Sequence, residues 1–485
     1  MSFFSTRGGA CVTASQAILW GLAKDGGLYV PSMFPQLSSE RMAALCGASY
    51  QEQAARILRD YLEDYTIAEI EQSVNAAYDD RHFDDPAVTP MHTLMPDVHV
   101  LELFHGPKLA FKDVALNLLP HLIRLAAEKN DEKREISILV ATSGDTGKAA
   151  LAGYAGLDGI EIQVFYPDAG TSEIQRLQMA TQTGDNVRVY AVSGNFDDAQ
   201  TGVKRVFGDA DVAKGLAARG ICLSSANSIN FGRLVPQIAY YFYSYFRMAG
   251  EGAVQWGEPV DFCVPTGNFG DILAGWYAKQ MGLPVGRLVC ASNKNNVLTD
   301  FITTGRYDAR REFYKTTSPS MDILISSNLE RLLAHLAGPE QVRQWMADLF
   351  DTGSYTVDAD TLAMLQKDFA CGCANDAQGA QEIRSRFEAD HYLCDTHTAV
   401  AFHVAERCRT DAPMVVLSTA SPFKFPRDVL AALGRGVPDS DFDAMCALTQ
   451  ATGCEAPRSL SALDSLPVRF TEVIRPEDIR TAALN

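Results

Sequence analysis

The sequence predicts an α/β fold in which parallel sheets are covered by helices, and two observations lead to this prediction. From about residue 98 onward, short apolar runs rich in β-branched residues alternate with helical windows. Such alternation is typical of parallel sheets that are buried on both faces. The chain has 485 residues, of which 47% are hydrophobic and 21% charged, so it can form a large core. We expect two or three domains.

The first 97 residues differ from the rest because their apolar positions have helical spacing. Ala14, Ile18 and Leu22 share one face, and positions 57, 61 and 65 share another. We therefore predict a mainly helical N-terminal region over residues 1–97.

The remaining chain divides into predicted strands and helices in alternation. The apolar runs that we interpret as buried strands are 136–141, 160–166, 187–192, 260–264, 288–291 and 414–417. The helical windows between them include 148–156, 173–183, 233–249 and 271–282. We predict a smaller α/β lobe over 98–235 and a larger α/β lobe over 236–485. The larger lobe is also expected to take elements from the N-terminal part.

Charge and cysteine content exclude several classes of partner. With 42 basic and 60 acidic residues the net charge is −18, which opposes binding to nucleic acid or to an anionic membrane. No stretch reaches the roughly 18 apolar residues of a membrane span.

The 11 cysteines lack dense spacing, which favours a reducing cytoplasm. Cys371 and Cys373 form one close pair, and we favour a loop with free thiols over a zinc site, because a second ligand pair is missing.

Three loops that follow predicted strands carry candidate ligand groups, because ligands of open α/β sheets bind beyond the carboxyl ends of the strands. The segment TSGDTG (142–147) offers hydroxyls and helix N-terminal amides to an anion, although an ordinary helix cap explains it equally well. The segment PTGNFGD (265–271) has two glycines that allow close approach to a phosphate, although a plain turn also fits. The segment STASP (418–422) places hydroxyls at a strand end, where a satisfied strand end is the simpler interpretation.

Lys112 is the candidate nucleophile. It lies in the segment FHGPKLAFKD (104–113), among apolar neighbours. Burial there would lower the pKa of its amine and allow it to form a Schiff base. Taken alone, a helix lysine that extends to solvent is the commoner interpretation.

Taken together, these segments resemble the threonine synthase family, in its longer, N-terminally extended class. The resemblance covers nearly the whole chain. It implies a pyridoxal-phosphate (PLP) enzyme of fold type II, similar in fold to the tryptophan synthase β subunit, with two lobes rich in parallel sheet. Besides the segments above, the matching segments are STRG (5–8), GLA (21–23) with DGGLYVP (25–31), LFHGP (103–107), SANSIN (225–230) with Arg233, SPSMDI (318–323), SSN (326–328) and LSTASP (417–422).

The resemblance implies a role for each candidate residue. Lys112 would bind the cofactor as a Schiff base and then act as a mobile base. Asp145 would lie near the phenolic oxygen of the cofactor. A carboxylate beside a phenolate is unfavourable, and the positive charge of Lys148 would stabilise it. Thr419 would lie at the pyridine nitrogen. The residues implied in binding the cofactor phosphate are Gly267, Asn268, Phe269, Gly270 and Asp271, and those implied in binding the substrate are Thr142, Ser143, Thr146, Lys148 and Arg233.

One departure from the family pattern concerns a histidine. Where the family often has Ala-His-Pro, this chain has Ala420-Ser421-Pro422, so any role of that histidine is absent. His105 and His397 lie near matching motifs, and their roles stay open because a lone histidine is usually structural. The basic residues of the matching segments that are candidates for the leaving phosphate are Arg7, Lys108, Lys148 and Arg233.

The implied activity is the last step of threonine biosynthesis, a carbon–oxygen lyase reaction on a phosphate ester. O-phospho-L-homoserine and water would give L-threonine and phosphate by γ-elimination and β-replacement, with PLP and without a metal. The enzyme is expected to be cytoplasmic, a monomer or homodimer, and without nucleic-acid or membrane partners. Two alternatives remain: a fold-type II relative that catalyses β-elimination, such as a dehydratase or phospholyase, and a binding protein without turnover. Intact Lys112 argues against the second alternative.

Overall fold

Two largely parallel sheets organise the computed structural model, which describes residues 1–142, 144–168 and 171–484. The smaller sheet has the order β15-β7-β6-β5-β8, and every neighbouring pair in it is parallel. Its strands are β5 (Glu135–Ala141), β6 (Ile160–Pro167), β7 (Val187–Val192), β8 (Ile221–Ser224) and β15 (Val473–Ile474). Except for the first residue, every residue of β5 is buried, as expected for a strand covered on both faces.

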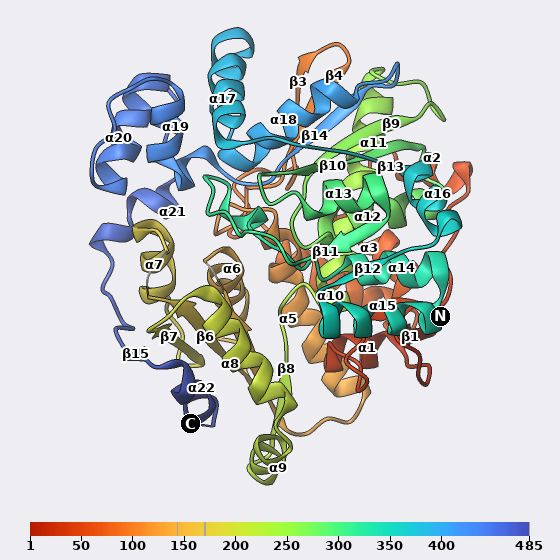
Figure 1. Cartoon of the computed structure of the whole chain (residues 1–485), viewed down its shortest axis with the longest axis vertical. Helices are drawn as coiled ribbons and strands as arrows, with labels where there is room; N and C mark the ends of the chain where they lie inside the picture. The colour runs from red at the N-terminus through yellow and green to blue at the C-terminus, as the bar shows by residue number, and fades with distance from the viewer. Residues whose placement is uncertain (143, 169–170, 485) are drawn as a thin grey trace.

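The larger sheet has the order β13-β10-β9-β14-β4-β3 and is parallel except for the edge strand β3. Its strands are β3 (Met91–Met95), β4 (Val98–Glu102), β9 (Val260–Pro265), β10 (Val285–Ser292), β13 (Phe369–Cys373) and β14 (Met414–Ser418). The α/β prediction is confirmed, with both sheets flanked by helices (Figure 1).

The chain passes between the two sheets more than once. Val98–Glu102 lies in the range predicted for the smaller lobe, yet it pairs with β3 and β14 in the larger sheet. Residues 473–474 return from the C-terminal end and pair with β7 in the smaller sheet. In Figure 1 this blue C-terminal segment runs down beside the yellow strands and helices of the smaller sheet.

The N-terminal region is mainly helical, as predicted, and side-chain caps begin its helices. Capping boxes pair Thr13 with Gln16, Ser49 with Glu52, and Thr66 with Glu69. The helices are α1 (Ala14–Trp20), α2 (Ser39–Leu45), α3 (Tyr50–Tyr61) and α4 (Ile67–Ala77), and the short strands β1 (Phe3–Ser5) and β2 (Tyr29–Pro31) pair antiparallel.

The remaining helices pack on the faces and ends of the two sheets (Figure 1). Those around the smaller sheet are α6 (Asp145–Tyr154), α7 (Glu173–Ala180), α8 (Phe196–Gly208), α9 (Ala210–Ala218) and α22 (Ile479–Ala483). The others are α5 (Lys112–Lys129), α10 (Phe231–Leu234), α11 (Ile238–Glu251), α12 (Gly270–Gln280), α13 (Val297–Thr304), α14 (Leu329–Ala337), α15 (Pro339–Thr352), α16 (Ala359–Asp368), α17 (Asp376–Asp390), α18 (Thr396–Cys408), α19 (Pro426–Ala432), α20 (Asp441–Thr452) and α21 (Arg458–Ser461). A second strand pair joins β11 (Arg306–Asp308) to β12 (Ser354–Thr356).

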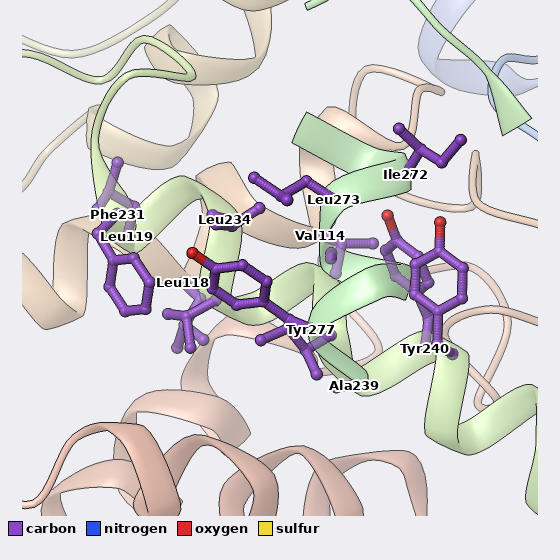
Figure 2. Close-up of a cluster of buried hydrophobic side chains, with 14 of the residues drawn as sticks. Val114, Leu118, Leu119, Phe231, Leu234, Ala239, Tyr240, Ile272, Leu273 and Tyr277 are labelled. Carbon is purple, nitrogen blue, oxygen red and sulfur yellow. The ribbon is translucent and has the colours of Figure 1, made fainter. Parts of the chain in front are cut away.

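A buried apolar cluster connects the two helices on which the candidate site depends. Side chains of α5 meet those of α10, α11 and α12, with Leu118, Leu234 and Leu273 among them (Figure 2). All three are almost completely inaccessible to solvent. Because such cores are close-packed, the N-terminal ends of α5 and α12 are held by the same core.

Two smaller expectations can be judged directly. Cys371 and Cys373 have free thiols, as predicted, but they lie in the edge strand β13 rather than in a loop, because residues 369–373 pair in register with β10. None of the helices in the described ranges has the length and apolarity needed to cross a bilayer.

Candidate active site

Lys112 is the first residue of α5 and is positioned by contacts between two loops. The loop before α5 lies against the loop after β14: the Phe111 N–H donates to the Thr419 carbonyl at 2.9 Å, and the Ser421 N–H donates to the Leu109 carbonyl at 3.1 Å. Ala110 and Ala420 also form an isolated antiparallel bridge. Two of the motifs identified from the sequence therefore meet at Lys112.

Asp113 fixes the shape of the loop before Lys112. Its buried carboxylate accepts hydrogen bonds from the Lys108 N–H at 3.0 Å and the Ala110 N–H at 3.2 Å. Leu109 between them has a positive φ of 59°, an unusual conformation for a leucine. The carboxylate thus satisfies amides that this tight turn would leave unpaired.

The amine of Lys112 is easily deprotonated. Burial lowers its pKa from 10.5 to about 8, and the positive charges of Lys424 and Arg233 act in the same direction against the opposing charge of Asp145. A neutral amine is the nucleophilic form of lysine. An appreciable fraction of Lys112 is therefore ready to attack a carbonyl near neutral pH.

The loop between β9 and α12 forms an anion cradle. Phe269, the N-cap residue of α12, has a φ of 61° and offers no side-chain acceptor to the amides of the first turn. Those amides and the helix dipole favour an anion at this end of α12. A Cβ atom at Gly267 would lie 2.8 Å from the Ser320 carbonyl oxygen, so the close approach of these backbones requires glycine.

Hydrogen bonds from residues 326–328 fix the main chain of this cradle. The Ser326 hydroxyl donates to the Gly267 carbonyl at 2.7 Å. The main-chain N–H and the side-chain Nδ2 of Asn328 both donate to the Asn268 carbonyl, each at 3.0 Å. These hydrogen bonds occupy the carbonyl oxygens of Gly267 and Asn268, and the N–H groups of the loop remain available for a ligand.

The side chains of Phe269 and Asp271 have partners inside the protein. Phe269 packs against Phe369 with ring centroids 5.5 Å apart. The Asp271 carboxylate accepts hydrogen bonds from the hydroxyls of Tyr240 and Tyr241, and burial raises its pKa to about 6. Both residues can serve a phosphate only through their main chain.

Asn268 and Gly270 complete the predicted phosphate loop. The Asn268 side chain is exposed, with its Oδ1 3.5 Å from the Ser327 hydroxyl. Gly270 begins α12, and a Cβ atom there would lie 3.4 Å from Nδ2 of Asn328.

Asp145 lies at the N-terminal end of α6 between two buried lysines. Its Oδ1 is 2.7 Å from Nζ of Lys148 and 2.9 Å from Nζ of Lys424. Its Oδ2 accepts from the Ser320 hydroxyl at 2.8 Å, and Gln175 donates to Oδ1 at 3.2 Å. Burial alone would raise the pKa of Asp145, but the charges of Lys148 and Lys424 hold it well below its usual range. Asp145 is therefore a stable anion.

Sequence reasoning anticipated Lys148 as the cation beside Asp145 but did not identify Lys424. Lys424 lies in the short 3₁₀ turn Pro422–Lys424, and its side chain is completely buried. A signal was present, because Lys424 lies between Phe423 and Phe425 just after a buried strand. The same pattern, a lysine among apolar neighbours, drew attention to Lys112.

The other predicted ligand residues are Thr142, Ser143, Thr146 and Thr419. Thr142 is buried, and its Oγ1 accepts from the N–H groups of Gly144 and Gly147 at 2.9 and 3.0 Å, so it shapes the turn into α6. Thr146 is partly buried in the first turn of α6. Ser143 lies outside the described residues. Thr419 is buried at the end of β14.

Arg233 is a buried cation in α10. Its Nη1 donates to the Ala226 carbonyl at 2.7 Å, whereas its Nε is buried without a hydrogen-bond partner among the described residues. Burial lowers its pKa to about 10. Its charge also lowers the pKa of Lys112, which places Arg233 in the electrostatic environment of the candidate site.

His105 takes part in an ion network. Its Nδ1 is 2.6 Å from Oδ1 of Asp84 and its Nε2 is 2.9 Å from Oε2 of Glu102. Burial alone would lower the pKa of His105, but these two carboxylates raise it to about 9. Both ring nitrogens are therefore occupied.

His397 is connected to Asp145 through one residue. Its Nδ1 is 2.8 Å from Oδ1 of Asp395, and its Nε2 accepts from the Ser320 N–H at 3.1 Å. An Nε2 that accepts carries no proton, so Nδ1 is the donor to Asp395. His397 thereby positions Ser320, whose hydroxyl donates to Asp145.

Three family models match the chain in succession. They are "Threonine synthase N terminus" over residues 2–78, "Pyridoxal-phosphate dependent enzyme" over 88–419 and "Threonine synthase, C-terminal" over 398–482. Threonine synthase of Schizosaccharomyces pombe is 39% identical over 469 residues, with 89% of each chain covered. Threonine synthase of Pseudomonas aeruginosa is 40% identical over 440 residues, covering 88% of this chain and 90% of that one.

Human threonine synthase-like 1 is 40% identical over 434 residues, which is 86% of this chain but 58% of that longer protein. Among solved structures, PLP-bound threonine synthase from Brucella melitensis has a TM-score of 0.89 and 37% identity, covering 100% of this chain and 99% of that one. The yeast enzyme has a TM-score of 0.88 and 34% identity, covering 99% and 97%.

The fold and the site define a PLP-dependent enzyme of fold type II. Within this class, the chain belongs to the threonine synthase family.

The residues present suit the cofactor. The cradle at the α12 N-terminus has free amides and a glycine where a side chain would clash, as a phosphate requires. Lys112 supplies an amine of lowered pKa, as attachment to an aldehyde requires.

Proposed function

We propose that this chain is a threonine synthase, which converts O-phospho-L-homoserine and water into L-threonine and phosphate. The observation that carries this proposal is the combination of the Lys112 amine with a separate group of buried cations around Asp145. A cofactor with one phosphate explains the cradle at α12. Additional buried cations fit a substrate that brings a second phosphate. Membership of the family supports the same substrate.

We assign Lys112 to two tasks. It would hold PLP through its amine, and when that amine is free it would accept protons from the substrate carbons. PLP, when bound, delocalises the electrons left at the substrate carbon next to the amino group. With a pKa of about 8, the Lys112 amine can take up and return a proton near neutral pH.

We base the remaining assignments on membership of the family, and the contacts between the loops around Lys112 support them. The amides of residues 267–271 would hold the cofactor phosphate, and Thr419 would be the residue beside the pyridine nitrogen. Asp145, which two lysines hold as an anion, would be the residue beside the phenolic oxygen. The turn at residues 142–146, with Lys148 and Arg233, binds the substrate.

One assay tests this function. Wild-type protein with added PLP should release threonine and inorganic phosphate in equal amounts from O-phosphohomoserine, and Lys112→Ala should release neither. Phosphate with ammonia and a keto acid in place of threonine would instead show a β-eliminating relative. A folded, cofactor-loaded wild type that forms no product would contradict the proposal.

We also propose a cytoplasmic enzyme that is a monomer or a homodimer. The described cysteines are all free thiols, as a reducing compartment favours. Cell fractionation and sedimentation of the full chain test the two statements separately.

A further inference from the structure

The two oxygens of the Asp145 carboxylate are held in different ways. Oδ1 faces side-chain nitrogens of Lys148, Lys424 and Gln175. Oδ2 accepts from the hydroxyl of Ser320 at 2.8 Å, and no other side chain in the described part of the chain donates a hydrogen bond to it. The two lysines contact the carboxylate without hydrogen-bond geometry, so they attract it without fixing its direction. The direction of Oδ2 therefore depends on where Ser320 holds its hydroxyl.

The N-terminal end of α18 fixes Ser320. The main-chain N–H of Ser320 donates to Nε2 of His397 at 3.1 Å. Three residues earlier in the same segment, the Thr317 carbonyl accepts from the Thr396 hydroxyl at 2.7 Å. Helix α18 packs on the larger sheet, whereas Asp145 begins α6, which follows β5 of the smaller sheet. The hydrogen bond between Ser320 and Asp145 therefore connects the two lobes.

Asp395 determines which nitrogen of His397 carries the proton. Its completely buried carboxylate accepts from the main-chain N–H groups of His397 and Thr398 and from the Thr398 hydroxyl, and it also contacts Nδ1 of His397. A carboxylate only accepts, so Nδ1 carries the proton and Nε2 stays an acceptor for Ser320. The carboxylate alone would cap α18, and the imidazole ring extends this fixed cap to Ser320.

We propose that Asp395 and His397 are positioning residues for the reaction, which act through Ser320 to orient the Asp145 carboxylate. This inference rests on the proposed function, because it takes Asp145 as the residue beside the phenolic oxygen of the cofactor. A carboxylate fixed next to that oxygen controls how firmly a proton is held there. A Ser320 hydroxyl that can turn away would therefore slow the chemical step and leave substrate affinity largely unchanged.

Two amide substitutions at His397 separate positioning from packing. Asparagine keeps a donor near the place of Nδ1 but is too short to accept from the Ser320 N–H, whereas glutamine brings an acceptor oxygen to the place of Nε2. We expect His397→Asn to lower kcat about 10-fold with KM changed less than about twofold, and His397→Gln to stay within about threefold of wild type. His403→Asn changes a partly buried histidine of the same helix, whose Nδ1 lies 3.4 Å from Glu382. It is the matched control and should leave both constants unchanged.

A double-mutant cycle with Ser320→Ala tests the route by which His397 acts. Ser320→Ala removes the donor to Asp145 and should lower kcat about as much as His397→Asn does. The double variant should be no slower than the slower single variant, because His397 then has no hydroxyl left to position. Losses that multiply would show that His397 acts without Ser320 and would overturn the inference. Wild-type kcat in folded, cofactor-loaded His397→Asn protein would overturn it as well.

Crystal structures of the cofactor-loaded proteins give a readout that does not depend on turnover. The Ser320 hydroxyl should leave Asp145 in His397→Asn and stay within hydrogen-bond distance in His397→Gln, and a bond retained in His397→Asn would overturn the inference. If His397→Asn fails to fold or to bind cofactor, the loaded wild type decides. Both hydrogen bonds of Ser320, to His397 and to Asp145, support the inference there, and loss of either overturns it. A loaded wild type that forms no threonine would contradict the proposed function, and the crystal structures would still decide the positioning of Asp145.

Discussion

Asn328 holds the carbonyl oxygen of Asn268 with two donors, its main-chain N–H and its side-chain Nδ2, each at 3.0 Å. The Oδ1 of Asn328 in turn accepts from buried Arg331, whose Nε donates to the Tyr29 carbonyl at 3.0 Å. The loop proposed to hold the cofactor phosphate is therefore supported through two side chains by the N-terminal strand β2.

Asn328→Asp should weaken PLP binding by roughly tenfold. The substitution keeps the size of the side chain and the oxygen that faces Arg331, but it replaces the Nδ2 donor with an acceptor opposite the Asn268 carbonyl. Fluorescence titration of the apoprotein with PLP measures the change. Asn375→Asp, which preserves the helix cap of α17, is the control and should bind PLP normally. Equal affinities for both variants would mean that the Nδ2 bond does not shape the cradle.

Gly267→Ala should prevent stable PLP binding. The new Cβ would lie 2.8 Å from a main-chain oxygen, which cannot move away as the end of a flexible side chain can. Gly436→Ala adds the same atom where nothing lies within 4 Å and should be neutral. The cofactor content after dialysis compares the two, and a fully loaded Gly267→Ala protein would disprove the close approach.

The rate of covalent PLP attachment to the apoprotein should rise with pH and level off above about pH 8. The neutral amine is the attacking form, and the pKa of Lys112 is lowered to about 8, chiefly by burial. The control is lysine in solution with its α-amino group blocked, whose side-chain amine has the ordinary pKa of 10.5. The rate of its reaction with PLP should continue to rise well beyond pH 8. Stopped-flow absorbance follows both reactions, and parallel profiles would show that the protein does not tune this amine.

His105→Gln should lose stability chiefly at mildly acidic pH. Burial alone would lower the pKa of His105, but its carboxylate partners raise it from 6.5 to about 9, so its contribution is complete below pH 6.5 and lost between 6.5 and 9. Burial alone would raise the pKa of Glu102, but His105 and His92 lower it from 4.5 to about 2. Its contribution is present above pH 4.5 and lost towards pH 2.

Urea unfolding of wild type and His105→Gln should therefore differ most between pH 4.5 and 6.5 and converge above pH 9. Because the two pKa shifts arise from one ion network, their contributions are not added. The free energies of unfolding of wild type and variant should therefore differ by at most about 3 kcal/mol. A difference that grows with increasing pH would contradict this interpretation.

Glu330→Gln should destabilise the protein by about 1–3 kcal/mol. Glu330 is mostly buried and accepts from the Thr6 hydroxyl at 2.6 Å and from Nε of Arg7 at 2.8 Å. Glu128→Gln, which removes the partner of Arg124 in an exposed pair, should cost less than about 1 kcal/mol. Thermal unfolding of the two variants, together with limited proteolysis of their N-terminal segments, measures the difference in stability between them. Equal melting temperatures would show that the buried pair adds little.

Much of the fold could be predicted from periodicity, because strands buried on both faces produce uninterrupted apolar runs. The run at 187–192 coincides with β7, and the run at 288–291 lies inside the longer β10, Val285–Ser292. Strands with a weaker pattern were missed. β3 is an edge strand without a buried residue, and β13 contains Gly372, so neither has an apolar run.

The site could be predicted only as far as local sequence reaches. Lys112 and the loop at 267–271 stand out within their own segments. The contacts of Ser320 with Asp145 and His397, and of Lys424 with Asp145, join residues that are far apart in the chain, so no local pattern reveals them. For these distant pairs the sequence supplies the residue types, and only the tertiary fold identifies the partners.

The bond between Thr6 and Glu330 spans 324 positions in the chain. During synthesis Thr6 leaves the ribosome long before Glu330 exists, so strands β1 and β2, which pair with each other, lack this link to α14 until about two thirds of the chain has been made. Because Asn328 and Arg331 belong to the same late segment, the cradle is completed at the same stage. A nascent chain that ends before this segment would thus be unable to hold the cofactor phosphate in the cradle.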